Sequence, residues 1–78
     1  MYITLTIKYK KYNKEYDIEV HNDNKIIDAI KIVNENFKID IALENIEFVK
    51  SIKNNSFIQS SLTFKEGNVW TGDILEIK

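Results

Sequence analysis

Apolar and polar residues alternate along the first part of the chain. From Tyr2 to Tyr9 every second residue belongs to one apolar face, which is the period of a half-buried strand. The alternation resumes from Tyr16 to His21 after a polar connection around Asn13, a residue that tolerates positive φ. The two runs together predict a β-hairpin. The predicted inward residues are Ile3, Leu5, Ile7, Tyr9, Tyr16, Ile18 and Val20.

The spacing of apolar residues changes to that of a helix after the polar segment 21–24. Across residues 25–37 they recur every three or four positions, which makes one stripe at 3.6 residues per turn. The Asp and Asn side chains of residues 21–24 are expected to cap the helix by accepting hydrogen bonds from its first N–H groups. The stripe consists of Ile26, Ala29, Ile30, Val33 and Phe37, widened by Ile27 and Ile32.

The second half of the chain has shorter apolar runs. For residues 38–45, a loop with buried anchors is favoured over a short strand. A third strand is predicted over residues 46–51, and a turn then leads to a small edge strand around Phe57. The other apolar anchors of this half are Ile39, Ile41, Leu43, Leu62, Phe64 and Val69.

A last strand is predicted over residues 74–77, with Leu75 and Ile77 inward. The Gly72–Asp73 pair before it is typical of a turn, with positive φ at the glycine and a local hydrogen bond from the carboxylate. The order of elements predicts an α+β domain with a mixed sheet of four to five strands and one main helix across it. A chain of 78 residues makes one such domain, residues 1–78.

Composition and charge exclude several classes of function. Eleven Lys against twelve Asp plus Glu give a formal net charge of -1, which does not by itself indicate nucleic acid or an anionic membrane as the partner. The absence of Cys excludes a disulfide framework and thiolate chemistry. The longest apolar runs are far shorter than the ~20 residues that span a bilayer. We therefore expect a cytoplasmic protein.

The chain offers little for catalysis, because it has one His and no Cys. His21 could share a metal ion with Asp17 and Glu19, but a solvated row on one strand face is the favoured interpretation. Gly67 and Gly72 do not have the spacing of a phosphate-binding loop. We predict no enzyme activity, no catalytic residue, no metal site and no cofactor.

Four short segments stand out by their order along the chain: Tyr2–Ile3, Tyr12–Asn13, Tyr16–Asp17 and the closing segment 71–77. Together they resemble the YukD/EsaB family of small ubiquitin-like proteins of bacterial type VII secretion systems. The resemblance implies a β-grasp (ubiquitin-like) fold. It also implies a cytoplasmic accessory or regulatory component of the secretion system, one that docks onto the membrane-embedded subunits of that system. No cofactor is implied. Segment 52–64 matches least well.

The resemblance also suggests how such a protein would act. Ubiquitin-like modifiers and sulfur carriers react through a free C-terminal Gly-Gly, whereas this sequence ends with Ile77 and Lys78. We therefore expect a protein that is not conjugated and that works by docking. Two alternatives stay open, a β-grasp domain with an unrelated protein partner and a nucleic-acid-binding module that uses the Lys- and Tyr-rich hairpin.

Two surfaces are candidates for protein binding. Trp70 directly follows the anchor Val69, where the chain is expected to reach the surface, and exposed large aromatic residues are enriched at binding hot spots. It could equally cover the edge of the core as a lid. The second candidate is the outer sheet face, where ubiquitin has an apolar patch and this chain is expected to be more polar. The predicted contact residues are Trp70, Asn68 and Thr71, together with Val49 and Glu76 on the sheet.

Overall fold

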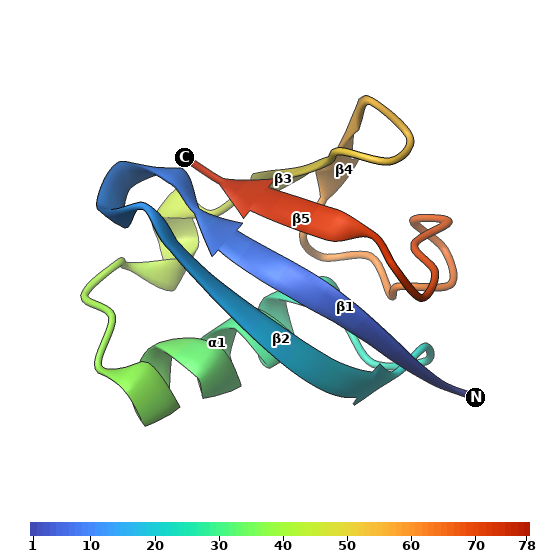
Figure 1. The fold of residues 1–78 in the computed structure, drawn as a ribbon, viewed down its shortest axis with the longest axis horizontal. Coiled ribbons are helices and arrows are strands. Elements are labelled where there is room, and N and C mark those ends of the chain that lie inside the picture. Colours follow the sequence, from blue (N-terminus) through green and yellow to red (C-terminus); the bar gives the residue numbers. More distant parts are fainter.

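Five strands and one main helix make up the protein (Figure 1). The structure is a computed structural model that describes residues 1–78. The regular elements are β1 Tyr2–Tyr9, β2 Lys14–His21, α1 Ile26–Phe37, β3 Phe48–Ser51, β4 Ser56–Gln59 and β5 Ile74–Ile77, with 3-10 turns at Lys10–Tyr12 and Leu43–Asn45. Every predicted strand and the predicted helix are present, and residues 38–45 form a loop that runs into the second 3-10 turn, as favoured.

The strands form one mixed sheet in the order β2-β1-β5-β3-β4. β1 and β5 are parallel, and the other neighbouring pairs are antiparallel. The helix α1 crosses one face of the sheet and leaves the opposite face, called here the outer face, without a helix (Figure 1). A mixed sheet with one helix across it confirms the predicted α+β, β-grasp architecture.

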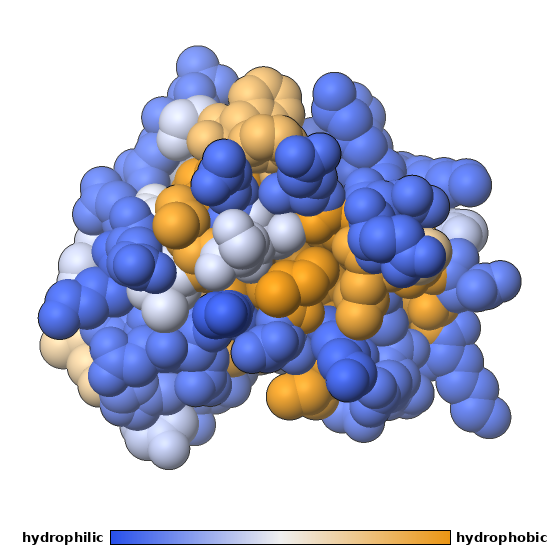
Figure 2. Space-filling model, turned by 180° about the vertical axis from the view of Figure 1, so that it is seen from behind, coloured by the Kyte–Doolittle hydropathy of each residue, from blue (hydrophilic) through white to orange (hydrophobic).

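The core lies between the sheet and α1. The alternating residues Ile3, Leu5, Ile7 and Tyr9 of β1 are all buried, as predicted. On the surface opposite to the view of Figure 1, hydrophobic residues also gather near the middle of the molecule, surrounded by hydrophilic ones (Figure 2). The other members of the buried apolar cluster are Ile26, Ala29, Ile30, Val33, Ile46, Val49, Ile58, Phe64, Val69, Leu75 and Ile77.

The two turns with positive φ are also confirmed, at Asn13 (53°) and at Gly72 (93°). The N-terminus of α1, however, differs from the prediction. Its N-cap residue is Lys25, and no side chain caps the helix. Instead, the N–H groups of Ile26 and Ile27 donate to backbone carbonyls of residues 62 and 60, each at 2.9 Å. The prediction of an Asp or Asn cap is wrong because a distant loop supplies the acceptors that a helix start requires.

The C-terminal end of α1 differs in a similar way. Phe37, predicted as part of the inward stripe, is 53% exposed and stacks on Tyr16 of β2 with ring centroids 4.1 Å apart. The inward position one turn earlier is taken by Asn34, which is buried. Its side-chain carbonyl accepts a hydrogen bond from the buried hydroxyl of Tyr9. This polar pair ends the apolar stripe inside the core.

The hydroxyl of Tyr9 should make stability depend on alkaline pH. Burial, with a smaller contribution from Tyr16, raises the pKa of Tyr9 from 10.0 to about 12. The folded state therefore favours the protonated phenol. Its contribution is fully present below pH 10 and is lost as the pH rises through 12. At about 1.4 kcal/mol per pKa unit, we expect a loss of about 3 kcal/mol in the free energy of unfolding.

Urea unfolding followed by circular dichroism at a series of alkaline pH values measures this loss. The control is Tyr9→Phe, which keeps the ring and removes the titrating group. Its stability should change less across the same window, so the difference between the two curves isolates the phenol. Parallel curves would contradict the assignment.

Candidate docking surface

The outer face of the sheet carries a mixed aromatic and charged surface. Strand register aligns Lys8 of β1 with Glu76 of β5, Glu76 with Lys50 of β3, and Lys50 with Phe57 of β4. Because side chains alternate between the faces of a sheet, these four residues share one face. A shallow hollow of about 440 Å³ lies at the β3–β4 side of this face. We call the residues Phe48, Lys50, Phe57, Glu76 and Lys78 that line it the outer-face surface.

Two phenylalanines dominate the outer-face surface. Phe48 is 48% exposed and Phe57 is 60% exposed. The ammonium groups of Lys50 and Lys78 lie 5.9 and 5.5 Å from the centroid of the Phe57 ring, within the range of cation–π attraction. The ring therefore lies near two cations, and Glu76 lies beyond Lys50 on the same face of the sheet. The outer face is more apolar than the sequence led us to expect.

The prediction that Val49 lies on the outer face is wrong. Val49 is 1% exposed and belongs to the core, whereas its neighbour Phe48 faces outward. Both alternating rows of this segment contain apolar residues, so the pattern does not choose between them, and a shift of one residue exchanges the faces. Pairing chooses the face here, because Val49 lies opposite Ile58 of β4, which is buried as well. Glu76 faces outward, as predicted, and is half-buried.

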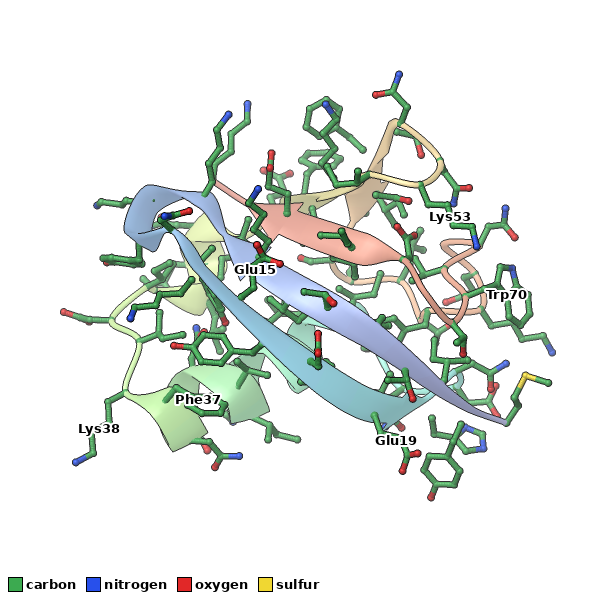
Figure 3. All side chains as sticks on the ribbon, in the orientation of Figure 1. Glu15, Glu19, Phe37, Lys38, Lys53 and Trp70 are labelled. Atoms are coloured by element: carbon green, nitrogen blue, oxygen red, sulfur yellow. The ribbon has the colours of Figure 1, made fainter.

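The second predicted surface forms a local cluster at the other end of β5. Trp70 is 42% exposed, and its indole N–H donates to the side-chain carbonyl of Asn68 at 2.8 Å. Asn68 has positive φ (58°), which turns the chain at this point. The hydroxyl of Thr71 accepts a hydrogen bond from the backbone N–H of Thr4 at 3.3 Å. The indole projects from the loop beyond the end of the sheet (Figure 3), so Trp70 is fixed by Asn68 yet remains accessible.

Two of the three residues considered for metal binding, His21 and Asp17, have other hydrogen-bond partners. His21 Nε2 lies 2.9 Å from the amino group of Met1, and its Nδ1 accepts from the backbone N–H of Asp23 at 3.2 Å. Asp17 accepts from the hydroxyl of Thr6 at 2.6 Å. No group of three His, Cys, Asp or Glu side chains has the arrangement of a metal site.

The carboxylate of Asp73 does more than the predicted turn chemistry. It accepts the expected local bond from the N–H of Ile74 at 2.7 Å. It also accepts from the hydroxyl of Ser51 at 2.6 Å and from the backbone N–H of Lys53 at 3.1 Å. Asp73 is 1% exposed, so this carboxylate is a structural link between β5 and the turn after β3. The sequence gives no signal for these two distant donors.

In the Lys- and Tyr-rich hairpin Tyr12 is 42% exposed, whereas Tyr9 is buried and Tyr16 is half-buried. The ammonium group of Lys11 lies 5.8 Å from the centroid of the Tyr12 ring, and the Tyr16 ring is stacked on Phe37. Lys8 lies opposite Glu15 across the hairpin, the partial neutralisation that the sequence predicted.

None of the helices is long and apolar enough to cross a membrane.

Comparison with solved structures identifies the fold. A designed protein based on ubiquitin superposes with a TM-score of 0.74 and 19% identity, covering 99% of this chain and 87% of that one. The chain has a ubiquitin-like fold. The ubiquitin-like domain of Plasmodium falciparum Dsk2 matches with a TM-score of 0.65 and 20% identity over 97% of both chains. The C-terminal ubiquitin-like domain of mouse tubulin-specific chaperone e matches with a TM-score of 0.68 and 15% identity, over 97% of this chain and 84% of that one.

No protein-family model and no curated protein matches the sequence. These three solved structures are each below 25% identical to this chain, so they establish its backbone arrangement and nothing more. The side chains of the outer-face surface and of the Trp70 loop are therefore the features from which its function has to be inferred.

Proposed function

We propose that the protein is a ubiquitin-like docking module that binds a protein partner, without covalent conjugation, through its outer-face surface. The observation that carries the proposal is the pair of exposed aromatic side chains, Phe48 and Phe57, beside a shallow hollow on an uncovered sheet face. Exposed aromatic anchors next to a pocket are typical of binding hot spots. The expectation that the protein is not an enzyme agrees with this role and stays a prediction.

Charge gives this surface its specificity. Lys50 and Lys78 flank the Phe57 ring, while Glu76 lies directly opposite Lys50 across the strand pair. Long lysine side chains can pack their methylene groups along an aromatic ring and keep the ammonium group in water. A partner would bury the rings and pair its own charges with this polar rim, which is the usual organisation of a protein interface.

We further propose that the partner belongs to a bacterial type VII secretion system, in which this protein is a cytoplasmic accessory or regulatory component. The support is the resemblance to the YukD/EsaB family over Tyr2–Ile3, Tyr12–Asn13, Tyr16–Asp17 and residues 71–77. The ubiquitin-like fold agrees with that resemblance. The cytoplasmic face of a membrane-embedded subunit is the proposed docking site, and Trp70, Asn68 and Thr71 are a second candidate contact.

An affinity capture from lysate of the protein's own host tests both parts of the proposal. The tagged protein is compared with a Phe48→Ala/Phe57→Ala variant and with Trp70→Ala, and bound proteins are identified by mass spectrometry. We expect secretion-system membrane subunits with the unmodified protein and their loss with the double variant. Loss with Trp70→Ala alone would move the interface to the loop. Recovery of unrelated proteins would contradict the secretion assignment and leave the docking proposal standing.

A further inference from the structure

The strand β2 forms a long open edge of the sheet. It pairs with β1 along its whole length, over eight residue pairs, and no strand lies on its other side (Figure 1). An unpaired edge presents backbone N–H and C=O groups that can hydrogen-bond an added strand. The other edge, β4, has only four residues. β2 is therefore the longer of the two edges at which the sheet could be extended.

The residues that present these free backbone groups can be identified from the neighbouring strand pair. The N–H of Thr6 and the C=O of Thr4 bond towards the β5 side, to residues 73 and 72. Successive residues of a strand point their backbone groups to opposite sides, so the odd-numbered residues of β1 bond to β2. Their partners in β2 are the even-numbered residues. The odd-numbered residues, Glu15, Asp17 and Glu19, therefore turn their backbone groups to the open edge.

An apolar groove runs alongside this edge, between β2 and α1. Its volume is about 430 Å³. Ile18 and Val20 of β2 line one wall and are only partly buried. On the helix wall, Ile32 is 58% exposed and Phe37 is 53% exposed. These side chains face the space that the inward side chains of an added strand would enter, because strand residues alternate between the two faces.

The charges around the groove are acidic. Asp17, Glu19 and Asp28 line it, and no Lys does. Across the hairpin, Glu15 faces Lys8, but Asp17 and Glu19 face Thr6 and Thr4. Neither of these two carboxylates therefore has a cationic residue directly opposite it in β1. Glu19 projects at the margin of β2, and Phe37 lies on the helix side of the same strand (Figure 3).

We infer that the β2 edge and its groove bind an extended segment of a partner protein in which apolar residues alternate with Lys or Arg. The segment would pair with β2 as a sixth strand. Its apolar side chains would enter the groove, and its cationic side chains would lie beside Asp17 and Glu19, since opposite charges on neighbouring strands attract. A second copy of this chain fits poorly, because pairing β2 with β2 would bring two rows of carboxylates together. The inference is independent of the outer-face surface, which lies on other strands.

A titration of the isotope-labelled protein with synthetic peptides, followed by NMR, tests the inference. The probe is a peptide of about six residues that alternates Lys and Ile, a usual strand length. We expect amide shifts concentrated in β2 and at Ile32, and slower hydrogen exchange at the N–H groups of Glu15, Asp17 and Glu19. A peptide that alternates Glu and Ile should bind at least about tenfold more weakly because its charges face carboxylates.

Two variants locate the site. Glu19→Lys should weaken binding of the Lys–Ile peptide by about tenfold, because it replaces an attractive cross-strand pair with a repulsive one. Glu44→Lys makes the same change of charge at an exposed position of the second 3-10 turn and should leave the affinity unchanged. Equal weakening by both variants, equal binding of both peptides, shifts centred on Phe57, or no shift at millimolar peptide would each overturn the inference. Shifts in β2 that depend on protein concentration alone would indicate self-association instead and would also overturn it.

Discussion

Replacing Asp73 with Ala is expected to destabilise the protein by at least about 3 kcal/mol. The substitution removes the common acceptor of three hydrogen bonds, from the hydroxyl of Ser51 and the N–H groups of Lys53 and Ile74. Each donor left without a partner away from water costs about 1–3 kcal/mol. A small domain has only about 5–15 kcal/mol in total, so a large part of the stability depends on this one carboxylate.

Urea unfolding at neutral pH measures this effect, with Ser51→Ala as the matched comparison. That variant removes one of the three donors to the carboxylate and the acceptor of the Asn54 N–H, but it keeps the other two bonds of Asp73, so its cost should be about 2 kcal/mol. Asp73→Asn should lie between the two, because its side-chain carbonyl can still accept from the N–H groups of Lys53 and Ile74, whereas its NH2 group cannot accept from the hydroxyl of Ser51. If Asp73→Ala were as mild as Ser51→Ala, the carboxylate would not link β5 to the turn after β3.

Replacing Phe57 with Ala is expected to weaken binding of the captured partner by about 30-fold or more. Phe57 has the most exposed ring of the outer-face surface, and truncation of an aromatic hot spot costs at least about 2 kcal/mol of binding free energy. Because the side chain is mostly exposed, the stability of the free protein should change by less than about 0.5 kcal/mol. Isothermal titration calorimetry with the purified partner measures the affinity.

The matched control is Tyr12→Ala, which truncates another partly exposed aromatic residue, in the 3-10 turn after β1. It should leave that affinity unchanged if the partner recognises the outer-face surface specifically. A similar loss with both variants would indicate unspecific apolar contact. An unchanged affinity with Phe57→Ala would contradict the proposal that this ring is a main contact of the partner.

The alternation of residues in β1 was sufficient to predict both the strand and its buried face. Every second residue from Ile3 to Tyr9 is apolar and the intervening ones are mostly polar, so only one face can be buried. The helical period likewise predicted the four buried apolar residues of α1, and alternation predicted Leu75 and Ile77 of β5. The α+β class and the order of elements followed from these patterns together.

The sequence did not predict the two aromatic rings of the outer-face surface. In the segment that forms β3, Phe48 and Val49 are adjacent and both apolar, so hydrophobicity cannot say which of them faces the core. The choice is made by pairing, since Val49 lies opposite the buried Ile58 and Ser51 is joined to Asp73 inside the protein. For this reason the prediction that Val49 is a contact residue on the outer face was wrong.

Local pattern determined the elements of this protein, because the period of apolar residues depends only on neighbours along the chain. Tertiary structure alone decided the interactions between distant residues. The carbonyls of residues 60 and 62 cap α1, and Asn34 pairs with Tyr9 in the core. It likewise decided which rings are exposed and that an acidic groove lies beside the free edge of β2. These properties arise where separate segments of the chain meet. The residues next to a buried polar group or an edge strand in the sequence do not show which distant groups will hydrogen-bond to it.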